Sequence, residues 1–540
     1  MRKILLLMCT LLLNLQSAFA FNVDAFIDNN IAPITNKIAA IVFTQLKVGS
    51  IEIPYIMLWI LVAGFFFTFF FKGISILGLK HSIDILCKKP EGDAATGSSG
   101  EVSSFQALAT ALSGTIGVGS IAGVAISISM GGPGAAFWIF AGAILGMSIK
   151  IIEASLAVKY RRFNLDGSVS GGPMHYIAHG LTRKKMRKLG QFLSIMFAVL
   201  CIGGGITGGN MIQINQSAHQ LIFITGGEAS FMHGYAWVFG LIVAILIGLT
   251  VVGGIKSIAK VTTVLVPTMC ATYIVCGLAI LLVACIPPLA KLLNATHLMS
   301  IGDCLALIVK EAFNPQAISG GFIGVLILGL RRSVQSNEAG TGAAAIVYST
   351  AQTKEPVSQG FVALIETLLT GILCLFTSVV IVITGAWKPV VAVFEAAKLA
   401  GEHVDVSGIE LASNAFESVI PFFPIVLSIV AIMFAISTLI SWAYYCQKAW
   451  TFLVGEGKKR VLTFNIIYCI FIVIGSAMNV KSVIDITDAM MIAMTIPNII
   501  VLYILAPEIK KELDDYCERH NLNYFGWVKD IKNIIKIKKA

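Results

Sequence analysis

Residues 112–126 read LSGTIGVGSIAGVAI, an apolar segment that carries four glycines where an ordinary membrane helix would continue. Glycine has no Cβ atom, so the backbone can leave helical angles there and lie close against a ligand. Unwinding a helix inside a bilayer leaves N–H and C=O groups unpaired, and each costs roughly several kcal/mol unless something binds it. The segment therefore predicts either a solute or ion site or a close interface between helices that pack through small residues.

The composition of the whole chain indicates a membrane protein with several spans. Of its 540 residues, 57% are hydrophobic and 13% are charged, and a soluble protein of this length could not bury so much apolar surface. The net charge of +10 does not indicate a nucleic-acid partner, because the basic residues cluster in short loops between apolar segments. The 11 cysteines are scattered and show no paired spacing for zinc.

The first 20 residues have the pattern of a secretory signal peptide. Arg2 and Lys3 precede an apolar run over residues 4–13, and the segment closes on Ala-Phe-Ala at 18–20. We expect cleavage after Ala20, which places the start of the mature chain outside the cell. An uncleaved first anchor is the alternative.

Apolar stretches of about twenty residues match the length of a bilayer-spanning helix. The sequence predicts eleven such spans, of which 102–126 and 317–349 are interrupted by glycines. They cover residues 53–71, 102–126, 136–158, 190–222, 235–253, 262–286, 317–349, 359–385, 418–447, 461–479 and 484–506.

The charges of the loops predict the orientation. With the N-terminus outside, the loop 159–189 lies in the cytoplasm and carries eight basic residues against one acid, Asp166, whereas the acid-rich loop 386–417 lies outside. The basic tail 507–540 then lies in the cytoplasm and can contact membrane lipid. We therefore expect a multi-pass protein of a bacterial-type inner membrane.

Ten spans remain when 53–71 is set aside as a leading helix, and the two interrupted spans then begin two groups of five. An odd number of spans per group forces the two groups into opposite orientations, and broken helices at matching positions indicate a transport site. A chance pairing of two glycine-rich helices is the alternative. The predicted organisation is a signal peptide (1–20), an extracytoplasmic N-terminus with leading helix and cytoplasmic loop (21–101), a first five-helix repeat (102–286), an external loop (287–316), a second five-helix repeat (317–506) and a basic cytoplasmic tail (507–540).

Several long motifs, in order along the chain, resemble the alanine or glycine:cation symporter family. Members of that family are secondary transporters that bring alanine, glycine or related small amino acids inward with sodium. The resemblance implies an all-α, five-plus-five inverted-repeat (LeuT-like) fold with one extra leading helix. The motifs are GTIGVGSIAGVA (114–125), GGPGAAFWIF (131–140), LGMSIKIIEASLAVKYR (145–161), SGGPMHYI (170–177), GNMIQINQSA (209–218), RRSVQSNEAGTGAA (331–344) and FAISTLISWAYYCQKAW (434–450).

This sequence departs from the family pattern at three positions beside the inferred pocket. Val118 replaces a threonine, Ser120 an asparagine, and Gln335 the usual phenylalanine before SNEAG. A somewhat altered small neutral amino acid is therefore as plausible a substrate as alanine.

A zwitterionic amino acid needs donors for its carboxylate and acceptors for its ammonium group. Unwound backbone supplies both without burying a net charge, and the N-terminus of a half-helix favours the carboxylate. We assign this role to Thr115, Gly117 and Gly119 in the first interrupted span. The amide of Gln213 offers a donor and an acceptor together, although it could equally serve interhelical bonding. In the second interrupted span, Asn337 is the leading candidate for a substrate contact.

Sodium prefers hard oxygen ligands. In related inverted-repeat symporters one sodium lies between the first and eighth core helices. Carried to this sequence, its ligands are the carbonyls of Ser113 and Ile116 and the hydroxyls of Ser437 and Thr438. The two adjacent hydroxyls could instead bond back to their own helix.

Buried ionisable groups are the remaining candidates. Glu338 could neutralise the ammonium group or hold the unwound strand, and we favour an inner gate in which it pairs with Arg331 or Arg332. Glu366 lies inside an apolar span, where carboxylates are costly enough to indicate a function. It could carry a proton or ligate an ion, or it could be a buried acid bonded to a neighbouring helix.

Lys150 and Glu153 are three residues apart on one helical face, and we expect them to form a structural pair. They lie near the cytoplasmic end of the span 136–158.

These observations predict a sodium-coupled symporter that imports small neutral amino acids by alternating access, with Na⁺ as coupling ion and no other cofactor. A proton-coupled transporter of the same fold is the nearest alternative, with Glu366 or Glu338 as the proton carrier. An ion channel is less favoured, because the sequence has two interrupted helices and no repeated filter. An enzyme is not expected, since neither an HExxH pair nor a GxSxG elbow occurs.

Overall fold

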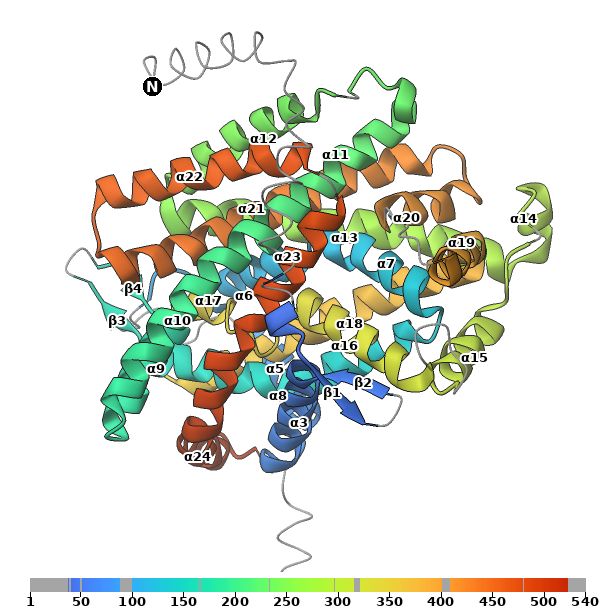
Figure 1. Cartoon of the computed structure of the whole chain (residues 1–540). Coiled ribbons are helices and arrows are strands. Elements are labelled where there is room, and N and C mark those ends of the chain that lie inside the picture. The colour runs from blue at the N-terminus through green and yellow to red at the C-terminus, as the bar shows by residue number, and fades with distance from the viewer. Residues whose placement is uncertain are drawn as a thin grey trace, which may run out of the picture.

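The computed structural model describes most of the chain, and the described part is almost entirely helical (Figure 1). The predicted signal peptide and the last residues of the predicted tail lie outside the described residues. The described residues are 37, 40–48, 51–87, 100–164, 167–232, 234–295, 297–314, 321–400, 408–478 and 480–522.

Within this described part, seven helices are long and apolar enough to cross a membrane, or up to nine if two bent helix pairs each count as one span. This confirms a polytopic helical membrane protein. Two further expected spans correspond to α12, which is 16 residues long, and to α16, which ends at the second interruption after 17 residues. Both are short for a full crossing, so the count of eleven stays a prediction.

The helices of the core follow the apolar segments closely. Their bounds are α6 Ser104–Thr115, α7 Ala122–Gly131, α8 Ala135–Lys159, α10 Arg187–Ile206, α11 Ile212–Ile224, α12 Ala236–Val251, α13 Gly254–Cys285, α16 Gly321–Asn337, α17 Ala345–Tyr348, α18 Pro356–Thr384, α21 Phe423–Val454, α22 Lys458–Ala477, α23 Val480–Ala493 and α24 Thr495–Arg519. Local sequence sets their ends: α18 begins at a proline, whose missing N–H costs nothing in the first turn, and it ends at Thr384, followed by Gly385 in the left-handed conformation with φ 70°.

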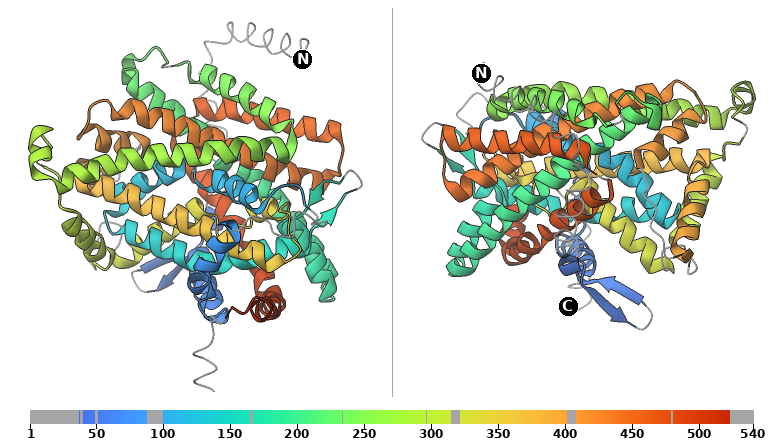
Figure 2. Two further views of the ribbon diagram at one scale, coloured as in Figure 1. Left: turned by 180° about the vertical axis from the view of Figure 1, so that it is seen from behind. Right: turned by 45° about the horizontal axis from the view of Figure 1, so that its top comes forward.

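Shorter elements surround this core. They are α3 Tyr55–Phe70, α4 Ile74–Leu77, α5 Leu79–Cys87, α9 Pro173–Arg183, α14 Pro287–Leu292, α15 Ile301–Ala312, α19 Trp387–Ala400, α20 Gly408–Glu417, and the antiparallel pairs β1 Gln45–Val48 with β2 Ile51–Pro54 and β3 Arg162–Phe163 with β4 Val169–Ser170. The β1–β2 hairpin projects away from the helices in the right-hand view of Figure 2.

Both predicted interruptions are present. The helix α6 ends at Thr115, a single 3₁₀ turn (η2, Val118–Ser120) follows, and α7 then leaves at an angle of 63° to α6. The helix α16 ends at Asn337, and the backbone then passes through left-handed angles at Glu338, Gly340 and Gly342, with φ of 55°, 88° and 76°. The glycine patterns in the sequence therefore predicted real breaks in the helices.

The long helices pack lengthwise around the interruptions. The helix α8 lies along α18, and α12 lies along α22 at one side of the bundle (Figure 1). The helix α21 contacts α6, α10, α11 and α13, and most of its residues are buried. The two interruptions are thus enclosed by helices instead of facing lipid, as unpaired backbone groups require.

A short backbone joint, called here the clasp, connects the segment before α6 to the segment after α17. Val102 and Ala351 form a parallel bridge, and the N–H of Gln352 donates to the carbonyl of Val102 at 2.8 Å. The guanidinium of Arg161 donates to the carbonyls of Ser349 and Ala351 at 3.0 and 2.6 Å. Burial lowers the pKa of Arg161 to about 10, so it remains charged at neutral pH and holds these carbonyls.

Helix packing through glycine gives a test of this arrangement. A Cβ atom at Gly209 would lie 2.1 Å from Cγ of Trp442, whereas one at Gly248 would meet only the Sγ of Cys469 at 3.5 Å. We expect Gly209→Ala to lower the free energy of unfolding by about 1–3 kcal/mol through overpacking. Gly248→Ala should leave it unchanged or slightly higher. Thermal unfolding in detergent compares the two variants, and equal midpoints would contradict the described packing.

Candidate functional site

The first interruption is held by a side-chain amide from another helix. Gln213 follows a π-helical turn (η3, Thr207–Met211) in the long helix made of α10 and α11. Its Oε1 accepts a hydrogen bond from the backbone N–H of Val118 at 2.9 Å, and its Nε2 donates to the carbonyl of Gly208 at 3.0 Å. Of the predicted substrate residues, Gln213 is therefore in direct contact with the unwound backbone.

Gly117 lies where three elements meet. A Cβ atom there would lie 2.6 Å from Oγ1 of Thr438 on α21 and 2.7 Å from Oε1 of Gln213 on α11, so no side chain fits without displacing them. A Cβ atom at Gly119 would meet nothing within 4 Å and would point into open space. Gly117 thus allows α21 and α11 to lie close against the unwound backbone. Gly119 borders open space.

The residues carried over as sodium ligands are neighbours in the structure. Thr438 Oγ1 donates to the carbonyl of Ser113 at 3.0 Å, and Ser113 Oγ donates to the carbonyl of Ser437 at 2.6 Å. Ile116 lies beyond the end of α6 with ψ 74°, outside helical angles. Ser437 Oγ bonds back to its own helix at Phe434 O, at 2.9 Å. Ser437 Oγ also lies 3.5 Å from the carbonyl of Ser113, so both hydroxyls reach α6, and that of Ser437 bonds back to its own helix as well.

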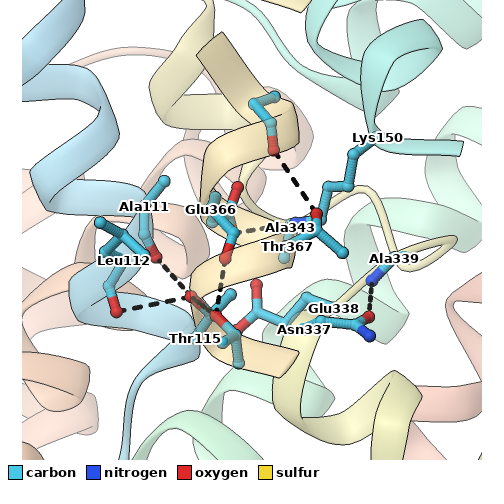
Figure 3. A network of polar contacts seen from close by, with 12 residues as sticks. Ala111, Leu112, Thr115, Lys150, Asn337, Glu338, Ala339, Ala343, Glu366 and Thr367 are labelled. Atoms are coloured by element: carbon cyan, nitrogen blue, oxygen red, sulfur yellow. Dashed lines mark hydrogen bonds and ion pairs between the residues drawn. The ribbon is translucent and has the colours of Figure 1, made fainter. Parts of the chain in front are cut away.

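Thr115 is bonded to its own helix and to α18. Its hydroxyl donates to the carbonyl of Ala111 at 3.2 Å and accepts from the hydroxyl of Thr370 at 3.4 Å. Figure 3 shows Thr115 beside α18. Its hydroxyl thus fastens the end of α6 to α18.

Asn337 stabilises its own segment. Its Nδ2 donates to Oγ of Ser333 at 2.9 Å, and its Oδ1 accepts from the N–H of Ala339 at 2.8 Å. It lines a small pocket between α3, α8 and α16, opposite Gly146 of α8. The contacts described for Asn337 therefore hold the second interruption and face α8, while Gln213 holds the first interruption.

A buried ion pair connects α8 to α18. Lys150 Nζ lies 3.0 Å from Oε1 of Glu366, with both side chains at most 1% exposed, and the hydroxyl of Tyr348 donates to Glu366 Oε2 at 2.8 Å. Figure 3 shows Lys150 reaching Glu366. The expected pairing of Lys150 with Glu153 is wrong. Because α8 lies along α18, the lysine meets a carboxylate across a dry interface, and Glu153 instead accepts from Asn498 Nδ2 at 2.6 Å.

The expected pairing of Glu338 with Arg331 or Arg332 is also wrong. Arg331 Nε and Arg332 Nη2 lie 2.6 and 3.7 Å from Oδ2 of Asp488 on α23. Glu338 accepts from the indole N–H of Trp442 at 3.0 Å. Six or seven residues of helix separate the arginines from Glu338, which is about 10 Å at 1.5 Å per residue, and the left-handed turn at Glu338 directs its side chain toward α21.

Sequence reasoning did not single out three residues that contribute here. Trp442 lies one helical turn after Thr438, Asp488 is an acid inside an apolar span, and Asn498 is an amide inside the same span. The last two carry the signal that identified Glu366, a polar group at membrane depth.

Comparison with known proteins gives consistent results. The model of the sodium:alanine symporter family matches residues 37–524. The sodium/alanine symporter AgcS of Methanococcus maripaludis is 33% identical over 467 residues, which cover 86% of this chain and 94% of that protein. An uncharacterised transporter of Haemophilus influenzae is 32% identical, with 87% and 94% covered, and the probable sodium/glutamine symporter GlnT of Bacillus subtilis is 31% identical, with 84% and 86% covered. Among solved structures, a manganese transporter of Eremococcus coleocola matches with a TM-score of 0.42 at 12% identity, covering 76% of this chain and 77% of that one.

The buried ion pair gives a stability prediction. Lys150→Met or Glu366→Gln alone leaves one charge buried without its partner, which should lower the free energy of unfolding by about 3–5 kcal/mol. The double variant K150M/E366Q removes both charges and keeps an acceptor for Tyr348, so it should recover most of that loss. Unfolding midpoints of the purified variants in detergent measure both effects. If the double variant loses as much as the two single losses combined, the two side chains do not act as a pair.

Proposed function

This chain belongs to the sodium:alanine symporter family, and we propose on that basis that it is a sodium-coupled symporter that imports small neutral amino acids, such as alanine or glycine, by alternating access. The family and the relatives compared above are transporters. The substrate, the coupling ion and the mechanism are the proposal.

The observation that carries the proposal is the meeting of unwound backbone, amide and hydroxyl around Gly117. The N–H of Val118 and the amide oxygen of Gln213 are bonded to each other, so a ligand that binds there takes the place of that bond, and Gly119 borders open space. These groups are uncharged, so a ligand with one positive and one negative group can be bound without leaving an unpaired protein charge. A carboxylate can accept from the backbone N–H groups while an ammonium group donates to the carbonyls freed by the break.

The proposed sodium ligands are the carbonyls of Ser113 and Ile116 and the hydroxyls of Ser437 and Thr438. Thr438 already lies within hydrogen-bonding distance of Ser113. A hydroxyl rotates freely, so it can turn a lone pair toward a cation without a change of backbone. Sodium bound there would connect α6 to α21 and stabilise the first interruption. Coupling of this kind typically amounts to about 1–3 kcal/mol between two ligands.

The proposed architecture is a LeuT-like arrangement of two five-helix repeats, 102–286 and 317–506, after a leading helix. It is supported by the two interruptions, each at the start of its group. The proposed location is the inner membrane, with the N-terminus outside and the C-terminus in the cytoplasm, as the basic loop 159–189 favours.

The choice of amino acid is proposed from the residues that depart from the family pattern near the two interruptions. The names of two relatives refer to neutral amino acids of different size, alanine for AgcS and glutamine for the probable symporter GlnT. Val118 and Ser120 are buried beside Gln213 and Thr115, and Gln335 contacts the guanidinium of Arg332. This contact lies within α16, because Arg332 precedes Gln335 by three residues, and the family's usual phenylalanine would offer only an apolar ring there.

Uptake into proteoliposomes tests the coupling ion. Radiolabelled alanine and glycine should accumulate under an inward sodium gradient but not under an equal choline gradient. Uptake that survives removal of sodium and collapses with a protonophore would instead support the proton-coupled alternative. Conductance without saturable uptake would support a channel.

The sodium site has a residue-specific test. Thr438→Val keeps the shape of the side chain but removes the oxygen, and we expect the sodium concentration for half-maximal uptake to rise about tenfold or more, equivalent to about 1.4 kcal/mol. Thr250→Val is the matched control, because the exposed hydroxyl of Thr250 bonds its own helix at Leu246 O, at 3.0 Å. An equal sodium dependence in both variants would remove Thr438 from the site.

A further inference from the structure

Three carboxyl groups and one lysine are buried around the second interruption. Glu153, Glu338 and Glu366 and the amine of Lys150 are each at most 1% exposed. Lys150 forms its ion pair with Glu366. If all four groups were ionised, two negative charges would remain without an ion-pair partner in a dry interior.

The three carboxyl groups differ in how their oxygens are satisfied. Both oxygens of Glu366 have partners, Lys150 and Tyr348. Glu338 has one partner, the indole N–H of Trp442 on Oε1, and among the described residues its buried Oε2 has no hydrogen-bond partner. Glu153 is similar, with Asn498 on one oxygen.

Glu338 differs from Glu153 in its position. It lies in the interruption itself, in a left-handed conformation with φ 55°, whereas Glu153 lies inside the continuous helix α8. Its bond to Trp442 joins the interruption to α21, the helix that carries Thr438 one turn earlier. A movement of either element changes the surroundings of Glu338.

The groups that face Glu338 offer little to stabilise a negative charge. Lys150 is the positive one among them and is held by Glu366, and the others are acids, or neutral at ordinary pH. They come from five elements: Lys150 and Glu153 on α8, Cys201 on α10, Tyr348 on α17, Glu366 on α18, and Trp442 and Tyr445 on α21.

The energies favour a protonated acid. An ionised carboxylate that is buried without a cation costs several kcal/mol. A neutral carboxylic acid with one unmade hydrogen bond costs only about 1–3 kcal/mol. A single hydrogen bond from an indole N–H does not compensate for this difference in free energy between the ionised and the neutral form.

We propose that Glu338 is a proton-binding site, and that its carboxyl group is a neutral acid in this conformation. The proton removes the negative charge of Glu338 from the second interruption, and the hydrogen bond from Trp442 connects Glu338 to α21. Its role in transport rests on the proposed function: Glu338 bonds through Trp442 to α21, the helix that carries two of the proposed sodium ligands, so a proton on Glu338 is a second cation beside that helix, and it leaves when the interruption becomes hydrated. The existence of the proton does not rest on that function.

Infrared spectroscopy of the purified full-length protein, without sodium or amino acid, tests the proposal directly. A protonated carboxylic acid has a distinct carbonyl stretch that shifts in D₂O. We expect Glu338→Gln to lose part of this band at neutral pH. Asp488→Asn is the matched control, because Asp488 is also 1% exposed but lies beside Arg331 and Arg332, and this variant should keep the whole band. A band of equal intensity in wild type and E338Q would overturn the proposal.

A second variant keeps the test decisive if E338Q does not fold. Trp442→Phe removes the indole N–H, the hydrogen-bond donor to Glu338 among the described residues. Because that bond favours the ionised form, its loss should make the band persist to higher pH than in the wild type. An unchanged pH titration of the band would overturn the assignment to Glu338. Because both spectra are recorded without transport, failed uptake bears on the proposed function alone, and a missing band bears on the proton site alone.

Discussion

Unwound backbone in an apolar surrounding must find a partner for each N–H and C=O group, and the described structure is arranged around that requirement at two places. At the first interruption the partner is the amide of Gln213, which accepts from Val118. At the second, Nδ2 of Asn498 donates to the carbonyl of Gly340 at 2.8 Å. At each break one of these side chains comes from a helix outside the broken one, and at the second break Asn337 adds a bond from the broken helix itself. Packing of α11 and α24 is therefore a condition for the breaks to exist.

The helix α21 connects the two interruptions. Within about one turn it bonds α6 through Thr438 and through Ser441, whose hydroxyl donates to the carbonyl of Thr110 at 2.9 Å, and it bonds the second interruption through Trp442. A shift of this one rigid element changes the partners of both breaks together. Coupling between two sites requires a shared structural element whose position is influenced by both sites.

The sequence predicted local features well and contacts between distant residues poorly. The glycines around Gly117 and Gly340 predicted both breaks, because whether a helix is interrupted depends on the residues at the interruption itself. The resemblance to a known family assigned Ser113 and Thr438 to one sodium site; the two are hydrogen-bonded in the structure, and sodium binding there stays a prediction. Lys150 was paired with Glu153, three residues away, but its partner is Glu366, 216 residues away. Spacing reveals which residues share one helical face, whereas the rotation of two helices against each other is set by the packing of the whole bundle.

The clasp between the two interrupted helices is made from backbone atoms. The N–H groups of Val102 and Gln352 and the carbonyls of Thr350 and Val102 form it, and all residues except proline possess such groups. Mutational drift at Val102 or Ala351 therefore leaves the hydrogen bonds in place. Constraint falls on neighbouring Gly100, where a Cβ atom would lie 2.6 Å from the carbonyl oxygen of Ala351. The two halves of the chain can thus diverge in sequence over evolutionary time while their joint stays the same.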